Sequence, residues 1–86
     1  MKEVHMFLME TCPHCKKATA LMEEIFAEHP EYKDVPLKKT DETKEPDYAA
    51  TFDYYYVPTF YVDGEKLHEG VPTKEAVEKV FAAALS

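Results

Sequence analysis

Two cysteines are the residues of this chain whose type and spacing best suit a chemical reaction. They are the only cysteines among 86 residues, and they occur in the run Thr11-Cys12-Pro13-His14-Cys15. An apolar segment precedes this run and a helical pattern follows it, so both thiols lie at the expected start of a helix. Two thiols three positions apart at a helix start can reach each other, and the first is readily ionised there. The spacing therefore indicates thiol–disulfide exchange.

The elements that must position this pair follow from length and composition. The chain reads as one small domain, residues 1–86, and its composition is 45% apolar and 13% aromatic, which supports a packed core. A net charge of −7 without any arginine argues against binding to nucleic acid or to an anionic membrane, since both need dense basic contacts. Residues 1–5 do not resemble a signal peptide, and no segment reaches membrane-spanning length. We therefore expect a cytoplasmic protein, and we expect it to be a monomer.

The hydrophobic pattern predicts a β-α-β-α-β-β-α order of elements. The expected elements are a strand at 4–9, a helix from 13 to 29, an edge strand at 35–40, a short helix from 46 to about 52, a hairpin of strands 59–62 and 65–69, and a helix from 74 to 85. The first strand is almost continuously apolar, as in a central strand covered on both faces. A right-handed crossover makes the first two strands parallel, so we expect an α/β fold with a four-stranded mixed sheet flanked by three helices.

Three further features define the local geometry. Asp63-Gly64 fits a tight primed turn in the hairpin, because both positions of such a turn need positive φ. Lys38 and Lys39 mark the second strand as an edge, where charged side chains are tolerated. Pro13 suits the first turn of its helix, since its missing N–H would be unpaired there in any case.

The element order, the Cys-Pro-His-Cys run and a Val57-Pro58-Thr59 run before the third strand together resemble the thioredoxin superfamily. The length resembles its small glutaredoxin-like branch, and the resemblance covers essentially the whole chain. It implies that Cys12 is the nucleophile and that Cys15 resolves the mixed disulfide. It also implies that the peptide bond before Pro58 is cis and that the Val57 backbone contacts the substrate chain.

These observations give a set of candidate site residues. The catalytic candidates are Cys12, Cys15, His14 and Pro13, and the substrate-binding candidates are Thr11, Val57, Pro58 and Thr59. The free N–H groups and the positive end of the helix dipole favour the Cys12 thiolate. The His14 imidazole, two residues further on, can add a hydrogen bond or a positive charge, or it is a solvent-exposed residue without a role.

His14 also bears on the direction of electron flow. Cys-Pro-His-Cys resembles the motif of periplasmic disulfide donors, whose potentials lie near −120 mV, against a cytosolic glutathione poise of about −220 to −260 mV. A couple as oxidising as these donors would be reduced in the cytosol and would be a poor reductant of other proteins. Either the protein is exported or its fold moderates the effect of the histidine, and the absence of a visible leader favours the second explanation.

The chain departs from the usual residues of the family at several positions. Thioredoxins usually carry a tryptophan before the first cysteine, where this chain has Thr11, and a buried aspartate on the first strand, where residues 4–9 hold no acid. The proton of Cys15 must then pass to another group or to water. Glutaredoxins usually carry a basic residue before the motif and a Gly-Gly turn before the last helix, where this chain has Glu10 and Glu69-Gly70. Acidic residues there weaken a glutathione site, so we expect no cofactor and leave glutathione open as a co-substrate.

Other interpretations of the same residues remain. Structural zinc needs four ligands, and the four histidines form no second pair at matching spacing, so no metal is expected. Tyr54, Tyr55 and Tyr56 precede Pro58 and either line a substrate groove or are ordinary aromatic packing.

The leading hypothesis is a thiol–disulfide oxidoreductase that exchanges disulfides with protein substrates in cell redox homeostasis. Its expected partners are disulfide-containing proteins, with glutathione or a thioredoxin-reductase-type enzyme as the upstream reductant. The alternatives are a dedicated electron donor to one partner reductase and a non-enzymatic thiol pair that binds metal or senses redox state.

Overall fold

The computed structural model describes residues 1–86, and its elements follow the predicted order with one addition. They are β1 (Val4–Leu8), α1 (Pro13–Glu28), η1 (Pro30–Asp34), β2 (Leu37–Asp41), α2 (Pro46–Ala49), β3 (Thr59–Val62), β4 (Glu65–Glu69) and α3 (Lys74–Leu85). The 3₁₀ helix η1 was not expected from the sequence. The second strand lies later than predicted, and α2 ends after four residues instead of extending to residue 52. A turn that bonds Thr51 N–H to the Tyr48 carbonyl at 3.1 Å follows it.

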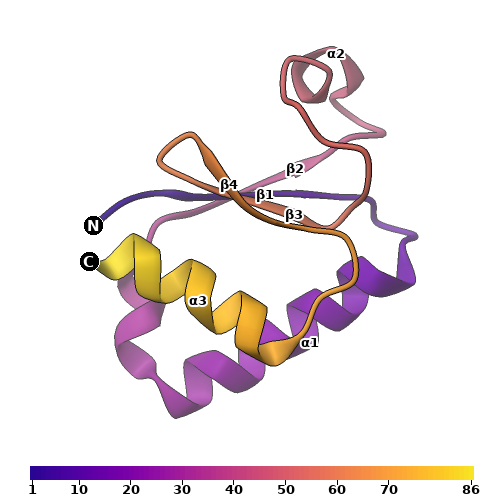
Figure 1. Ribbon diagram of the computed structural model, residues 1–86. Coiled ribbons are helices and arrows are strands. Elements are labelled where there is room, and N and C mark those ends of the chain that lie inside the picture. Colours follow the sequence, from indigo (N-terminus) through magenta and orange to yellow (C-terminus); the bar gives the residue numbers. More distant parts are fainter.

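The four strands form one sheet in the order β2-β1-β3-β4. β1 pairs in parallel with β2 and antiparallel with β3, and β3 pairs antiparallel with β4 (Figure 1). The prediction that β2 is an edge strand and β1 a central strand is therefore confirmed. The carboxyl ends of β1 and β2 lie at the same edge of the sheet, as parallel strands require.

The hairpin between β3 and β4 closes through the predicted turn. Asp63 has φ 51° and Gly64 has φ 83°. Positive φ at both central positions matches the right-handed twist of the flanking strands, and glycine adopts it without steric cost.

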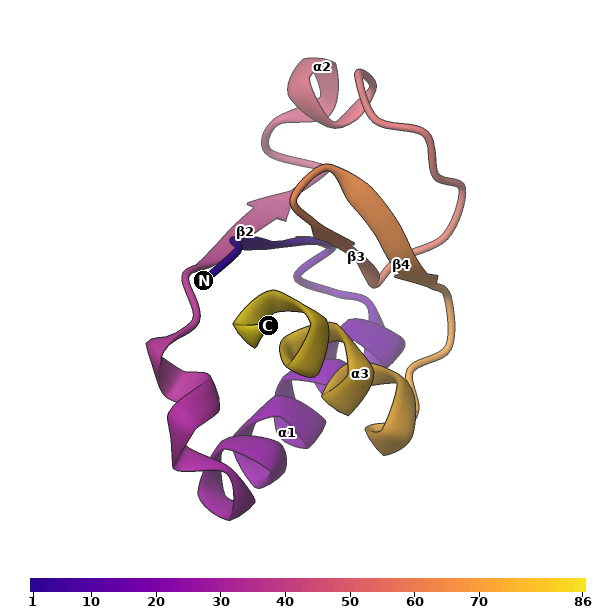
Figure 2. The ribbon, with the colours of Figure 1, turned by 60° about the vertical axis from the view of Figure 1, so that its left-hand side comes forward.

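The sheet separates two unequal layers. α1 and α3 cover one face, and the short α2 lies over the other (Figures 1 and 2). The main core fills the space between the sheet and the two long helices. Its largest fully buried members are Phe60, Phe81, Met6, Ile25, Val4, Val77 and Val80. This burial is the main stabilising contribution and fixes how α1 lies on the sheet.

The second face of β1 carries an aromatic cluster. Phe7 is fully buried there and contacts the ring of Tyr54, with ring centroids 4.9 Å apart, and that of Phe52 at 4.6 Å. His5 lies on the same face, and its Nε2 is hydrogen-bonded to the buried Thr40 hydroxyl at 2.8 Å. β1 is thus covered on both faces, as its continuous apolar run predicts.

The two long helices begin where the sequence places their starts. Pro13 occupies the first turn of α1 and follows Cys12, which has extended backbone angles. Thr73 caps α3, and its hydroxyl accepts a hydrogen bond from Ala76 N–H at 3.2 Å. None of the helices combines the length and the apolar composition needed to cross a membrane.

Candidate active site

The start of α1 holds Cys12 as its N-cap residue. The Cys12 backbone has φ −79° and ψ 121°, and its carbonyl accepts the hydrogen bond of Lys16 N–H at 3.1 Å. No acidic residue occurs in the first turn of the helix. The positive end of the helix therefore acts on the Cys12 sulfur without a competing carboxylate in that turn.

The pKa of Cys12 results from two opposing effects. Burial, which is the largest effect, disfavours the charged thiolate, since only 9% of the residue is exposed. Hydrogen bonds from the Cys15 backbone N–H, the Cys15 thiol and the His14 backbone N–H favour the thiolate and outweigh burial, so the pKa of Cys12 lies below its usual value of 9.0. A lowered pKa is the property that a nucleophilic thiol needs.

Cys15 lies one helical turn further on and has the opposite character. It is 4% exposed, and burial is the largest of the effects that raise its pKa to about 12. Its hydrogen bond to the Cys12 sulfur and the negative charge of that sulfur contribute to the same shift. Its own sulfur accepts a hydrogen bond from Met9 N–H at 3.5 Å. Both cysteines are free thiols, so the site is in its reduced form.

The loop before β3 lies directly beside the nucleophile. The Val57 carbonyl oxygen lies 3.9 Å from the Cys12 sulfur, and the Val57–Pro58 peptide bond is cis, which confirms the expectation from the sequence. Thr59 is fully buried, and its hydroxyl donates to the Tyr56 carbonyl at 2.5 Å, so it supports the loop from inside. Residues 45 positions apart are thereby brought together at one site.

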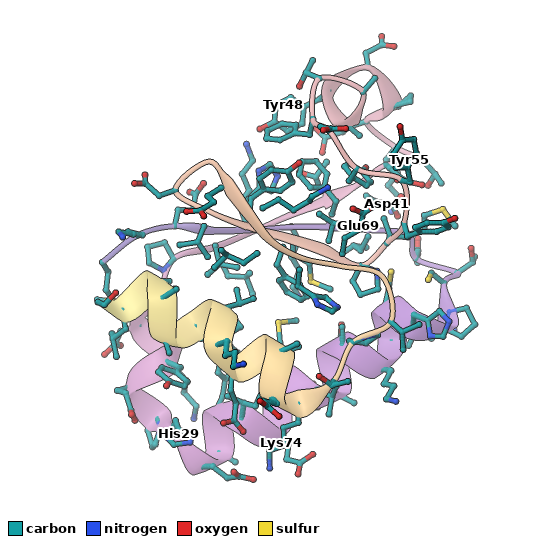
Figure 3. All side chains as sticks on the ribbon, in the orientation of Figure 1. His29, Asp41, Tyr48, Tyr55, Glu69 and Lys74 are labelled. Carbon is teal, nitrogen blue, oxygen red and sulfur yellow. The ribbon has the colours of Figure 1, made fainter.

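Glu69 fixes the same loop from the end of β4. One carboxylate oxygen accepts hydrogen bonds from Tyr55 N–H at 2.5 Å and Tyr56 N–H at 2.9 Å, and the other accepts from Lys66 at 2.7 Å. Figure 3 labels Tyr55 and Glu69 at this end of the molecule. These hydrogen bonds, first the one from Lys66, lower the pKa of Glu69 to about 2. Gly70 follows with φ 93°, a conformation that glycine favours, and turns the chain toward α3.

The remaining candidates lie around the thiol at the surface. His14 is exposed and, with Tyr56, Val57, Gly70 and Val71, lines a cavity of about 330 Å³. Its imidazole makes no hydrogen bond, and the contribution of this residue to the pKa of Cys12 comes through its backbone N–H. A role of the imidazole stays a prediction. Thr11 and Pro13 are exposed next to the thiol on either side of it.

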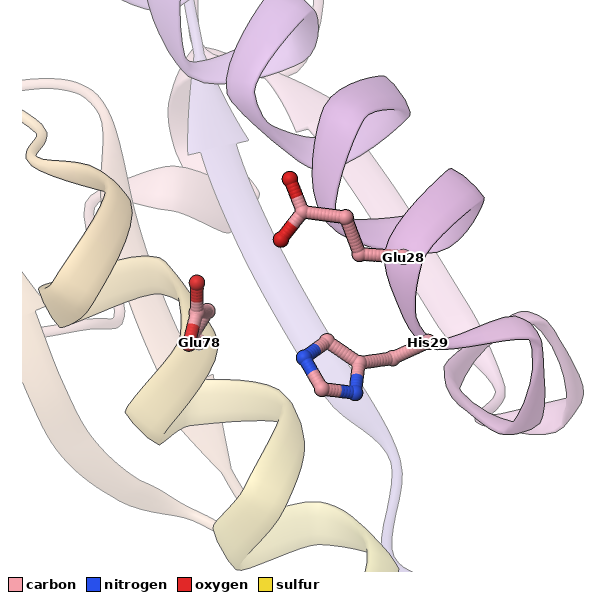
Figure 4. A group of neighbouring side chains, drawn as sticks. All are labelled: Glu28, His29 and Glu78. Carbon is pink, nitrogen blue, oxygen red and sulfur yellow. The ribbon is translucent and has the colours of Figure 1, made fainter.

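The side chains that could together hold a metal ion lie elsewhere. The ligand atoms of Glu28, His29 and Glu78 lie within 4.8 Å of one another and point toward a common centre (Figure 4). The cluster contains neither cysteine, and the length of α1, about 24 Å at 1.5 Å per residue, separates it from Cys12. Lys74 already pairs with Glu28 and, at 3.0 Å, with Glu24.

Two acids near the dithiol were not expected as site residues. Glu69 was considered only as an obstacle to glutathione, whereas the structure makes it the anchor of the Tyr55–Tyr56 backbone. Glu42 follows β2, and its charge acts on both cysteines. Only the expected parallel pairing of the first two strands could have indicated Glu42, because it places the residues after both strands at one sheet edge.

Comparison with known proteins agrees with this geometry. Residues 2–82 match the model of a family described as a thioredoxin domain. The chain is 32% identical over 83 residues to a thioredoxin of Methanocaldococcus jannaschii, with 96% of this chain and 95% of that protein covered.

The fold is also shared with solved thioredoxins. The oxidised thioredoxin of Plasmodium falciparum superposes with a TM-score of 0.72 at 19% identity, with 99% of this chain and 82% of that chain covered. Fasciola hepatica thioredoxin superposes with a TM-score of 0.71 at 21% identity, with 96% of this chain and 80% of that chain covered.

The site thus consists of a reduced dithiol at a helix start and a cis-proline loop that faces it, both on a four-stranded mixed sheet. The family match covers most of the same sequence. The chain belongs to the thioredoxin domain family. Family and fold together support a redox role of the thiol–disulfide oxidoreductase kind.

The two thiols should ionise in separate steps in an ultraviolet titration of the reduced protein. Cys12 should ionise below pH 9 and Cys15 near pH 12, because the hydrogen bonds that stabilise the first thiolate come partly from the second thiol. Cys15→Ala removes that donor and should raise the pKa of Cys12. A Cys12 thiol that is still protonated at pH 9 in the wild-type protein would contradict this assignment.

Acid should release the loop that Glu69 holds. The folded pKa of about 2 lies below the usual 4.5, so the stabilisation by the charged form is complete above pH 4.5 and is lost as the pH falls toward 2. The NMR shifts of the Tyr55 and Tyr56 amide protons should therefore change across this interval. Glu69→Gln should abolish the step, and Glu65→Gln, on the same hairpin, should retain it. Identical titrations of wild type and Glu69→Gln would show that the carboxylate does not hold the loop.

Proposed function

We propose that this protein is a small cytoplasmic dithiol–disulfide oxidoreductase of the glutaredoxin/thioredoxin type, which exchanges disulfides with protein substrates through Cys12 and Cys15. The observation that carries the proposal is that the pKa values of two neighbouring thiols are shifted in opposite directions. The first has a lowered pKa at the helix start, and the second is buried with a raised pKa.

The chemistry follows from this difference. The Cys12 thiolate attacks one sulfur of a substrate disulfide, an S–S bond forms between them, and the other substrate sulfur leaves as a thiolate. Cys15 then loses its proton and attacks the Cys12 sulfur, which forms the Cys12–Cys15 disulfide and releases the second substrate sulfur. Two electrons pass from the protein dithiol to the substrate. The second step is intramolecular, so it gains from the high effective concentration of a neighbouring thiol.

The loop beside Cys12 is the proposed substrate-binding surface. The Val57 carbonyl faces the reacting sulfur at 3.9 Å, and the buried Pro58 and Thr59 hold that backbone in place. Thr11, which precedes Cys12 in the chain, is exposed. A substrate chain lying along this backbone would present its sulfur to Cys12.

A dedicated electron donor to one partner is the second candidate, and the exposed surface next to the thiol favours it. Tyr56 is 70% exposed and Val71 58%, and both line the cavity beside His14, where neighbouring exposed apolar side chains are typical of an interaction surface. A protein that docks on this surface would recognise it in addition to the disulfide. Turnover of unrelated disulfides at comparable rates favours the general oxidoreductase, and turnover of a single partner favours the donor.

The order of the two steps predicts different defects in two variants. Cys12→Ser should abolish insulin disulfide reduction, because the only nucleophile with a lowered pKa is lost. Cys15→Ser should still attack but should accumulate mixed disulfides, which are visible by non-reducing electrophoresis and mass spectrometry. Undiminished insulin reduction by Cys12→Ser would eliminate the proposed mechanism.

The direction of electron flow can be measured by equilibration with glutathione redox buffers. We expect a Cys12–Cys15 potential between about −200 and −270 mV, as in glutaredoxins and thioredoxins, because burial and the Glu42 charge oppose thiolate stabilisation. Such a value would suit a cytoplasmic reductant supplied by glutathione or by a reductase. His14→Ala should lower the potential if the imidazole adds positive charge. A wild-type potential near −120 mV would identify an oxidant and contradict the cytoplasmic assignment.

A further inference from the structure

The resolving step raises a question of proton transfer. Cys15 keeps its proton at neutral pH, yet it must lose that proton when it attacks the mixed disulfide. β1 carries no acid between Val4 and Leu8 to receive it. A group near both sulfurs, with access to solvent, would remove this obstacle.

Glu42 follows β2 and lies beside the end of β1 that also contacts Cys15. Its N–H donates to the Leu8 carbonyl at 2.9 Å, and the next residue of the chain, Met9, donates its N–H to the Cys15 sulfur at 3.5 Å. Two backbone contacts thus tie Glu42 and Cys15 to adjacent residues at the end of β1. The charge of Glu42 also acts on both sulfurs, which agrees with this proximity.

Tyr54 holds the Glu42 carboxylate in place. Its hydroxyl donates to Oε1 at 2.8 Å, and its ring lies against Phe7 in the core with centroids 4.9 Å apart. The other oxygen, Oε2, accepts no hydrogen bond from the protein and is not sealed from solvent. Glu42 and Tyr54 also line an open cavity of about 390 Å³, which is large enough for several waters at roughly 30 Å³ each.

The other charged groups near the dithiol are less suitable. Glu10, Lys16 and Lys39 line a cavity with Cys15, and Tyr54 contacts Glu42. Asp41 and Lys44 contact Glu10, and His14 lies next to Cys15 in the first turn of α1. Asp41 already accepts hydrogen bonds from the Thr43 hydroxyl, the Thr43 N–H and the Glu10 N–H. Glu10 is paired with Lys44 at 3.3 Å, and its side chain is 74% exposed. Glu42 is the carboxylate that remains.

We propose that Glu42 accepts the proton of Cys15 in the resolving step, directly or across one water, and that Tyr54 is its positioning residue. The carboxylate takes the thiol proton, the Cys15 sulfur forms its bond to the Cys12 sulfur, and the bond from Cys12 to the substrate sulfur breaks. The leaving thiolate receives a proton from the Glu42 carboxyl group or from solvent. The inference depends on the proposed function, since it concerns the second step of that exchange.

A single-turnover reaction with 2,2′-dithiodipyridine separates the two steps. Attack by Cys12 releases the first thiopyridone, and attack by Cys15 releases the second. The first phase tests the proposed function, and the second tests the role of Glu42. The wild-type second phase should vary little between about pH 6 and pH 8, because the carboxylate accepts the proton throughout this range.

Glu42→Gln keeps the size of the side chain and removes the base. Its second phase should slow by about tenfold or more at pH 7 and should then rise about tenfold per pH unit, while the first phase stays at least as fast. Tyr54→Phe should slow the second phase by a smaller factor, because the carboxylate is present but less well placed. Glu45→Gln removes the same charge from an exposed position and should leave both phases unchanged.

The outcomes separate the two proposals. A full first phase in Glu42→Gln shows that the variant is folded with an intact nucleophile. A second phase that is unchanged or faster would overturn the role of Glu42, because its charge alone makes the ionisation of Cys15 harder. Absence of the first phase in the wild-type protein would overturn the proposed function instead.

Discussion

Two opposing effects on the ionisation of the Cys12 thiol determine the chemistry of the site. Burial favours the neutral thiol of Cys12, and hydrogen bonds from the first turn of α1 favour its thiolate. One of these bonds comes from the Cys15 thiol, so the group that makes the first sulfur acidic is also the group that attacks it in the exchange that we propose. Two cysteines separated by two residues thereby acquire different acidities, and this difference would set the order of the two steps in the exchange that we propose. The sheet and the core serve to keep the helix start in that position.

Features that depend on local pattern were predictable from the sequence. The start of α1 follows from Pro13 and from the apolar spacing behind it, and the primed turn follows from Asp63-Gly64. The central position of β1 follows from its continuous run of apolar residues, since a strand with one solvent-exposed face would alternate apolar and polar residues. The edge position of β2 follows from its lysines, which interior strands avoid. These predictions succeed because each depends on residues that are neighbours along the chain.

The parts that escaped prediction depend on residues far apart in the chain. Glu42 meets the Leu8 carbonyl and the Tyr54 hydroxyl, and Glu69 meets two backbone N–H groups more than ten residues away. In a chain with 17 acidic residues, nothing local distinguishes these two from acids that only face solvent. The early end of α2 has a similar cause, because Phe52 packs against Phe7 and so follows the aromatic cluster and not a helical repeat.

The segments that surround Cys12 come from widely separated stretches: the start of α1, the residue after β2, the loop before β3 and the end of β4. In an unfolded or newly synthesised chain these stretches are apart, and both cysteines are ordinary thiols without the pKa shifts of the folded protein. The difference in acidity between the two thiols therefore arises only with tertiary structure. The unfolded chain exposes two equivalent thiols, whereas the folded protein has one acidic thiol and one protected thiol, so the ratio at which a thiol reagent labels Cys12 and Cys15 is a sensitive gauge of native content.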